Sequence, residues 1–537
     1  MELKRLDSED LEIILGTLRE FAERELPLER RLEWDREDVC PEQVVREMIG
    51  PDVGLHLVFI PEEHDGMGGG AYDVYRLSCE FAKVDVGLAT AMLAIALGTD
   101  PIRVGATDEQ QARWMTRIAN EGLIVAYGVT EPEAGSNVEN LKTKAERVTD
   151  EAGDVTHYKL NGVKQFISNG AIADLFTILA KAPDGPTFFV VERGAEGLSP
   201  GKQEEKHGIR LSNTSQVVLE DVLIPADNIV GAREGEGIKQ SNEVFGFTRL
   251  MVAAFGLGAG VSALEKAIEY SKERKQFGTY LREKQGYTHK LLVPASVRLA
   301  AARAYIEHVA ELLDASDADR QIEGSVAKLF ATEVGNAAAE DAIQALGGYG
   351  YCAEYEVEKI KRDARILTIY EGTSEIQQNI IGVFRMRQSV KSKGGFYREM
   401  ADQVAGLEHV GGRAVAGAAR LVGDCAVMAF RKKLSRKQHG VFELALAMAD
   451  VETAVALCRA AAAAEGDELI AAQSRLWAAE VALAVPARLL RLFAGAGVLT
   501  DDEVADLTAR ADLPGAVALQ AGTLADMDLV AERITAD

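Results

Sequence analysis

The chain has 537 residues, with 84 acidic and 59 basic side chains and a formal net charge of -25. Such an acidic protein would repel nucleic-acid phosphates, which excludes a general nucleic-acid-coating role. Hydrophobic residues at 47% and charged residues at 27% are typical of a folded globular protein, and at about 100–200 residues per domain the length predicts several domains.

The cysteine and histidine patterns exclude two common kinds of site. The cysteines are odd in number and form no CxxC pair, which argues against a disulfide framework and a zinc ribbon. No histidine has metal-ligand spacing, so no metal site is predicted. The N-terminus lacks the apolar core of a secretory signal, and we expect a cytoplasmic protein with reduced thiols. These thiols belong to Cys40, Cys79, Cys352, Cys425 and Cys458.

Residues 1–123 are predicted to form an N-terminal helical domain. The acidic segment 7–10 is typical of a helix start, and apolar residues then follow helical spacing until Pro27. The glycine-rich segment 66–70 lacks the Gly-Lys-Ser/Thr ending of a phosphate-binding loop, so we interpret it as a connector between helices.

Residues 124–235 are predicted to form a small antiparallel β-barrel or β-sandwich, because short alternating runs replace the helical period. Asn161-Gly162 lies between two such runs. Both residues tolerate positive φ, so this dipeptide predicts a hairpin turn.

Helical spacing returns over residues 236–388 and predicts a four-helix bundle, broken at residues 347–350. Segment 391–395 is predicted to be a linker, and the alanine-rich residues 396–537 to form an added helical domain. The apolar stretch 251–264 is too short and glycine-rich for a membrane span. Within it, residues 258–263 match a dinucleotide-binding pattern, but no strand precedes them, so glycines that let helices approach closely are favoured.

Two segments of the predicted β-domain could carry chemistry. Residues 127–136 read as a strand and a Pro/Gly turn that exposes backbone amides and hydroxyls, although an ordinary turn is the alternative. Phe166 and Ser168 are two residues apart, so in a strand their side chains share one face. An aromatic ring beside a hydroxyl suits a planar heterocycle, but a core aromatic is the common alternative.

A third segment, residues 370–377, contains the capping-box pattern Ser374-x-x-Gln377, which predicts a helix that begins at Ser374. Glu371 then lies in the loop before the cap, and Gly372 would allow a ligand to approach closely. A solvated loop acid is the alternative interpretation.

These three segments, together with residues 273–278 and 344–348, occur in one order and at separations that resemble the acyl-CoA dehydrogenase family. The resemblance covers residues 1 to about 385, and the order of helices, β-domain and helices agrees with it independently. It implies a mainly α fold with a central β-domain, and an FAD-dependent enzyme that oxidises the Cα–Cβ bond of an acyl-CoA.

In this resemblance Glu371 takes the position of the catalytic base, which removes the α-proton while the β-hydride passes to the flavin. Electrons would then pass to electron-transfer flavoprotein. Some members place the base in the helix before Arg249, but residue 248 is threonine here, so Glu371 is the candidate that fits. Burial beside substrate should raise its pKa, and the following helix N-terminus should lower it.

The resemblance also implies a set of binding residues. Phe166 and Ser168 stand where tryptophan and threonine are usual beside the flavin. The FAD-binding set is Tyr127, Val129, Thr130, Gly135, Ser136, Phe166, Ser168, Arg274, Gln276, Phe277, Gln285, Gln344, Gly347, Gly348, Thr373 and Glu375. The substrate-binding set is Ser136, Arg249, Tyr370, Gly372, Ala89 and Leu93.

Substrate length and assembly are expectations from the same resemblance. Ala89 and Leu93 stand where medium-chain members have larger polar residues, which suggests a deeper apolar pocket and medium to long acyl chains in fatty acid β-oxidation. The tail resembles that of very-long-chain members and implies a homodimer. Its basic segment 431–437 coincides with one tied to membrane association in those relatives, but a solvated charged turn is favoured here.

Rival functions are an acyl-CoA oxidase, which shares the base and flavin, and a non-catalytic binding, assembly or DNA-protective member of the family. Retention of Glu371 and the charge of -25 argue against the non-catalytic and DNA-protective hypotheses.

Overall fold

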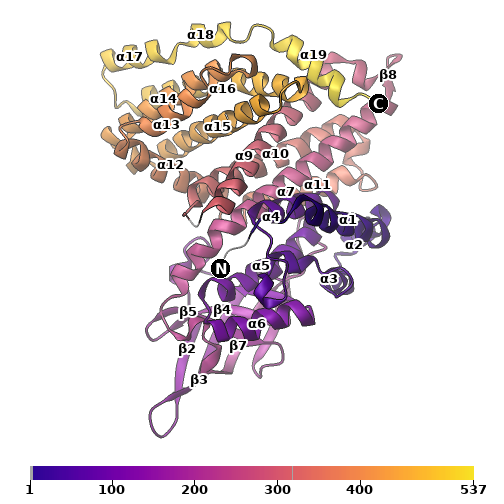
Figure 1. The fold of residues 1–537 in the computed structure, drawn as a ribbon, viewed down its shortest axis with the longest axis vertical. Coiled ribbons are helices and arrows are strands. Elements are labelled where there is room, and N and C mark those ends of the chain that lie inside the picture. The colour runs from indigo at the N-terminus through magenta and orange to yellow at the C-terminus, as the bar shows by residue number, and fades with distance from the viewer. Residues whose placement is uncertain (1–3, 317) are drawn as a thin grey trace. The chain divides into compact units, whose positions relative to one another are not determined.

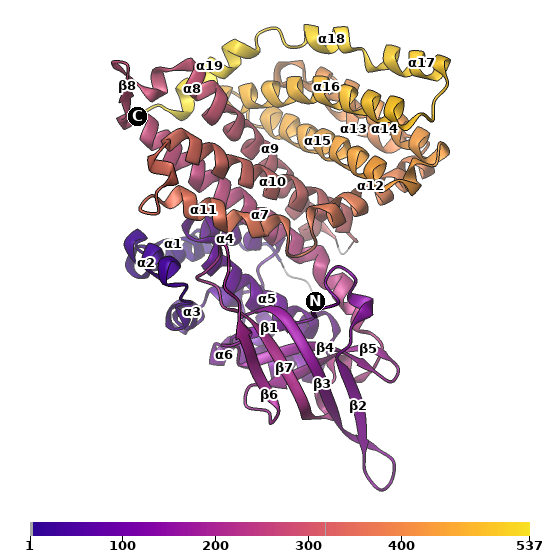
Figure 2. The ribbon, with the colours of Figure 1, turned by 180° about the vertical axis from the view of Figure 1, so that it is seen from behind.

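The computed structural model describes residues 4–316 and 318–537, apart from the side chains of residues 245–247. The chain forms two compact units, one of residues 1–255 with 313–319 and the other of residues 256–312 with 320–537. The chain as a whole is mainly helical, as predicted, and the β-sheet lies in the first unit (Figures 1 and 2).

The first unit begins with six helices. Asp7 caps the first of them through bonds from the backbone N–H groups of Glu9 and Asp10, as the acidic start predicts. The helices are α1 (Ser8–Glu25), α2 (Leu28–Glu37), α3 (Glu42–Met48), α4 (Ala71–Val84), α5 (Val86–Gly105) and α6 (Asp108–Glu121). Helix α5 is almost wholly buried and packs on the sheet, where Thr177 donates to the carbonyl of Gly98.

The sheet has seven strands in the order β1-β4-β2-β3-β7-β6, with β5 paired to β4 (Figure 2). Most neighbours are antiparallel, as predicted, but β1 and β2 each pair with β4 in parallel. The strands are β1 (Val125–Gly128), β2 (Lys144–Thr149), β3 (Val155–Ser168), β4 (Leu175–Ala182), β5 (Gly185–Glu192), β6 (Leu198–Gln203) and β7 (Thr214–Pro225).

The predicted hairpin at Asn161-Gly162 is wrong. Strand β3 runs straight through both residues, and the turn between β2 and β3 lies at residues 150–154 instead. The side chain of Asn161 exchanges two hydrogen bonds with Asp221, and a Cβ on Gly162 would lie 2.4 Å from Oγ1 of Thr143. A bulge and a close approach between strands therefore explain this dipeptide.

Helix α7 (Gly237–Glu273) contributes residues to both units. The second unit continues with the short hairpin of β8 (Lys275–Gln276) and β9 (Thr279–Tyr280). Its other helices are α8 (Gln285–Tyr287), α9 (Val293–Ala315), α10 (Gln321–Leu346), α11 (Glu356–Ala364), α12 (Ser374–Lys391), α13 (Gly395–Val404), α14 (Gly412–Arg431), α15 (Gln438–Ala463), α16 (Glu468–Ala496), α17 (Asp501–Ala511), α18 (Leu513–Ala518) and α19 (Thr523–Ile534).

Glycines bring α7 and α10 into close contact, which confirms the packing interpretation of the glycine-rich run. A Cβ on Gly260 would lie 3.0 Å from the Cα of Gly335, and a Cβ on Gly335 would lie 2.1 Å from the carbonyl oxygen of Gly256. By length and composition α5 and α7 could each cross a membrane, but 94% and 93% of their apolar windows are buried inside the protein, as in core helices.

The predicted linker at residues 391–395 is a short turn between α12 and α13, and the tail does not form a separate unit. Helices α14 and α15 pack directly on α12. In the basic segment 431–437, the ammonium of Lys432 lies 2.6 Å from the carboxylate of Glu503. Part of the positive charge of this segment is therefore neutralised by an acidic residue of the tail itself.

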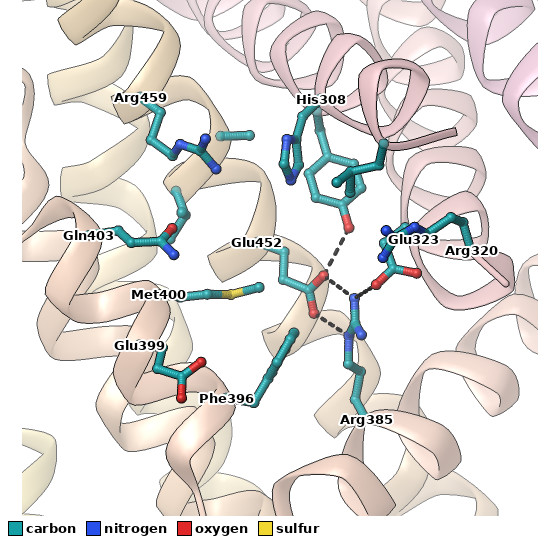
Figure 3. A pocket seen from close by; sticks show the side chains of 14 residues that line it. His308, Arg320, Glu323, Arg385, Phe396, Glu399, Met400, Gln403, Glu452 and Arg459 are labelled. Atoms are coloured by element: carbon teal, nitrogen blue, oxygen red, sulfur yellow. Dashed lines mark hydrogen bonds and ion pairs between the residues drawn. The ribbon is translucent and has the colours of Figure 1, made fainter. Parts of the chain in front are cut away.

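A buried charge network joins the bundle to the tail around a cavity of about 240 Å³ (Figure 3). Glu452 of α15 accepts two bonds from Arg385 of α12, at 2.8 and 2.9 Å, and one each from the hydroxyls of Tyr305 and Tyr397. Arg385 also donates to Glu323 of α10. Because Arg385 and Glu452 are 1% and 2% exposed, each charge depends on the other for compensation.

Glu452→Gln should therefore lower the free energy of unfolding by about 3–5 kcal/mol, since it leaves the Arg385 guanidinium buried with a weakened partner. Glu480→Gln is a matched control, because Glu480 belongs to a solvent-exposed pair with Arg298 and should change stability by less than about 1 kcal/mol. Urea unfolding followed by circular dichroism measures both. Equal midpoints for the two variants would contradict the role of the network.

Candidate functional site

The predicted site residues fall in both units. Strand β1 places Tyr127 at its end, where the ring packs 5.7 Å from that of Phe188. The chain then turns at Glu131 and Ala134, which exchange backbone hydrogen bonds. Beyond the turn Gly135 and Ser136 are exposed, and a Cβ on Gly135 would meet no atom within 4 Å. The backbone at this turn is therefore accessible to a ligand.

A buried ion pair between Glu131 and Lys164 holds this turn in place. Glu131 accepts a bond of 2.7 Å from the ammonium of Lys164 and further bonds from the backbone N–H groups of Lys142 and Thr143. Lys164 also donates to the carbonyls of Val129 and Leu179. Both side chains are buried, so strand β3 holds the carbonyl of Val129 in place through a charged donor.

Burial alone would raise the pKa of Glu131, but Lys164 and the backbone donors outweigh it and hold that pKa below its ordinary value. Burial lowers the pKa of Lys164 to about 8 despite its partner. No sequence pattern indicated the role of either residue, because a lone lysine in a strand and a glutamate in a turn are both typical of a solvated surface.

The second predicted segment lies beside the first. The backbone N–H of Gln165 donates to the carbonyl of Thr130, which joins the end of β3 to the turn after β1. The expectation of a regular strand is wrong at Phe166, which has φ of 58° and sits at a register shift. Burial still alternates from exposed Phe166 through buried Ile167 to half-buried Ser168. Phe166 is 63% exposed, which excludes a core aromatic. Its exposed ring is available to a flat ligand.

Three predicted substrate-binding residues of the first unit are buried. Ala89 and Leu93 lie one turn apart on α5 and are 1% and 3% exposed. Asn169, just after β3, donates to the carbonyl of Ala91 between them. Arg249 lies in α7 and is 7% exposed.

In the second unit, Arg274, Gln276, Gly347 and Gly348 line one pocket of about 410 Å³. Its wall includes Tyr349, whose ring centroid lies 5.7 Å from the Arg274 guanidinium. A Cβ on Gly347 or Gly348 would meet no atom within 4 Å, so the backbone here is open.

Three other predicted residues lie outside this pocket. Phe277 is at the tip of the β8–β9 hairpin, with φ of 52° and 97% of its surface exposed. Gln344 is exposed near the end of α10, and Gln285 donates to Asp528 of α19. Tyr270 and Tyr349 also line the pocket, and no pattern in the sequence identified them as ligand-binding residues.

The loop before α12 carries Tyr370, Glu371 and Gly372. Helix α12 begins at Ser374, as predicted, but its cap is Thr373, whose hydroxyl accepts from the N–H of Ile376. The Ser374 hydroxyl donates instead to Glu333, at 2.6 Å, so the predicted capping box is wrong. Glu371 has φ of 51° and Gly372 has φ of 87°. The direction of the Glu371 side chain is therefore set by two consecutive residues in the left-handed backbone conformation.

The predicted ligand residue Glu375 lies in the first turn of α12. Its own backbone N–H and the Thr373 hydroxyl hold the pKa of Glu375 below its ordinary value, with smaller contributions from Arg365 and Lys328. An ionised carboxylate at this helix N-terminus is the form that the helix dipole favours. Among the described residues no group of three potential metal ligands occurs, and the cysteines are free.

Comparison with known proteins gives three family matches in one order. Residues 8–122, 126–222 and 235–384 match the N-terminal, middle and C-terminal domains of acyl-CoA dehydrogenase. A short-chain-specific acyl-CoA dehydrogenase of Clostridium acetobutylicum is 35% identical over 384 residues, which are 70% of this chain and 98% of that protein. The caffeyl-CoA reductase–Etf complex subunit CarC of Acetobacterium woodii is 34% identical over 381 residues, covering 70% and 97%.

The crystal structure of an acyl-CoA dehydrogenase complexed with FAD from Bacillus anthracis superposes with a TM-score of 0.85 at 25% identity. It covers 98% of this chain and 95% of that one, so the similarity includes the tail.

Lys164→Met should lower the free energy of unfolding by about 3–5 kcal/mol at pH 7, because it leaves the Glu131 carboxylate buried without its partner. The lowered pKa of Glu131 makes its contribution present above the unfolded pKa of about 4.5 and lost as the pH falls through the folded pKa. The difference between the two proteins should thus narrow as the pH falls from 7 to below about 4.5, where the wild-type protein loses this contribution. Denaturant titrations at several pH values test this.

Lys159→Met is the matched control, since Lys159 lies on the same strand with its side chain 39% exposed. It should leave the stability nearly unchanged at every pH. A constant difference between wild type and Lys164→Met across this pH range would contradict the coupling of Lys164 to Glu131.

Proposed function

The chain belongs to the acyl-CoA dehydrogenase family, and we propose on that basis that it is an FAD-dependent enzyme that oxidises an acyl-CoA thioester to the trans-2-enoyl-CoA. The observation that carries the proposal is Glu371, a carboxylate in a left-handed loop directly before α12, inside the matched C-terminal domain. Removal of the α-proton by Glu371 leaves the enoyl double bond when the β-hydride departs. Bound FAD supplies the acceptor for that hydride.

The residues predicted to hold FAD fit a flat ligand with phosphates. Phe166 offers an exposed ring, and the turn at Gly135 and Ser136 offers open backbone beside hydroxyl groups. Arg274 offers a cation in a pocket whose glycines leave the backbone accessible. An aromatic face, open amides and a guanidinium are the groups that heterocycles and phosphates require.

The proposal also covers the electron acceptor, the oligomeric state and the cellular location of the enzyme. Electron-transfer flavoprotein is the proposed electron acceptor, supported by the Acetobacterium relative, which is named as a subunit of an Etf complex. A homodimer is proposed, because the tail resembles that of dimeric relatives. A cytoplasmic enzyme of fatty acid β-oxidation agrees with free cysteines throughout the described residues.

Glu371→Gln should bind acyl-CoA and FAD but lose flavin bleaching, because the amide cannot accept the α-proton. Anaerobic stopped-flow absorbance after mixing with an acyl-CoA measures the bleaching, and a ligand-induced spectral shift measures binding. Normal bleaching by the variant would overturn the assignment of the base. Rapid reoxidation of the wild-type flavin in air would identify an oxidase instead.

We propose medium to long acyl chains as substrates. Ala89 and Leu93 are buried, apolar and one turn apart on α5, which supports an apolar lining rather than a polar floor.

Ala89→Leu should lower kcat/KM for the longest accepted acyl-CoA by roughly tenfold or more relative to a short one, because added side-chain volume excludes methylene groups. Bleaching rates for wild type and variant across a series of graded chain lengths measure this. Leu77→Met, a volume-conserving change in the buried face of neighbouring α4, is the control. A uniform effect on all lengths would contradict the role of Ala89.

A further inference from the structure

We propose that Lys328 is a positioning residue for Glu371, holding the backbone of its loop through a buried charged donor and favouring the ionised carboxylate. The inference rests on the proposed function, in which Glu371 is the base. Lys328 lies in α10 and is 0% exposed. Its ammonium donates to the carbonyl oxygen of Gly372 at 2.7 Å, although 44 residues separate the two in the chain.

The loop needs such support because its backbone is in an unfavourable conformation. Glu371 has a left-handed φ of 51°, which costs energy for any side chain other than glycine and is adopted by glutamate only where neighbouring contacts enforce it. Gly372 follows with φ of 87°. A carboxylate on this loop stays at one place only if the peptide groups on both sides of it are held.

A second donor holds the same peptide groups without a charge. The side-chain amide of Gln377 donates to the carbonyls of Glu371, at 3.1 Å, and Gly372, at 3.0 Å. Gln377 is also 0% exposed. A Cβ on residue 372 would lie 2.5 Å from this amide nitrogen, so glycine is required there. Lys328 and Gln377 therefore both hold the loop backbone by donating to its carbonyls, but only Lys328 carries a charge.

The charge of Lys328 reaches the carboxylates around the loop. The charged groups at this loop include Lys328 and Glu333 from α10, Arg365 from the turn after α11, and Glu375 from α12. Glu333 is engaged by the Ser374 hydroxyl. Lys328 contributes to lowering the pKa of Glu375, and the same cation favours the ionised form of Glu371.

The test is the pH dependence of flavin bleaching in Lys328→Met, a substitution that keeps the apolar stem and removes the ammonium. Loss of a charged hydrogen bond should slow bleaching by roughly 10- to 100-fold. The acidic limb of the kcat/KM profile should move to higher pH, because the carboxylate loses a stabilising cation. Amide hydrogen exchange at residues 370–375 of the protein without substrate should become faster.

Two matched variants separate charge from packing. Gln377→Leu should slow bleaching and speed exchange, yet leave the acidic limb at the wild-type pH. Lys328→Arg keeps the charge and should leave the limb unmoved. If Lys328→Met does not accumulate as folded protein, Lys328→Gln carries the same expected shift of the limb.

A wild-type acidic limb or wild-type bleaching in Lys328→Met would overturn the proposal, since a merely structural lysine predicts no shift of the limb. Glu371→Gln is measured in parallel. If that variant still bleaches, the proposed base is wrong. If it does not bleach while Lys328→Met behaves as wild type, only the role of Lys328 fails.

Discussion

A positive charge buried in the protein interior must be matched by acceptors, and this constraint determines the most specific features of the structure. Lys164 is matched by Glu131 and two carbonyls, Lys328 donates to the carbonyl of Gly372, and Arg385 is matched by Glu452 and Glu323. In each case residues far apart in the sequence become joined at one point. Two of these three buried cations, Lys164 and Lys328, hold segments that are predicted to bind the cofactor or to carry the catalytic base.

The layout of elements could be predicted because helical and alternating periods are local signals. The helices, the sheet segment, the break at residues 347–350 and the start of α12 at Ser374 all follow from them. The failures have a common cause. Asn161-Gly162 and Phe166 each occupy an irregular position within β3 that tertiary neighbours impose, and short-range propensity cannot register a neighbour such as Thr143 or Asp221.

The candidate site, like the fold, could be predicted only in part from the sequence. Glu371 could be found because residue type, loop position and family pattern coincide in one short segment. Lys164 and Lys328 could not, because a lysine in sequence is most often a surface residue, and only the fold reveals that both are fully enclosed. The pattern thus identified groups that would touch ligands, whereas the groups that hold them in place required three-dimensional contacts.

The network around Glu452 constrains how the tail can change over evolutionary time. A deletion of residues 396–537 would remove both Glu452 and Tyr397 and leave Arg385 with Glu323 as its charged partner. The same deletion would also remove α14 and α15 from α12, so water would reach the guanidinium and its charge would not be left uncompensated. The costly event is the loss of Glu452 while the tail still covers Arg385, so these two residues should be inherited together in every descendant that keeps the tail.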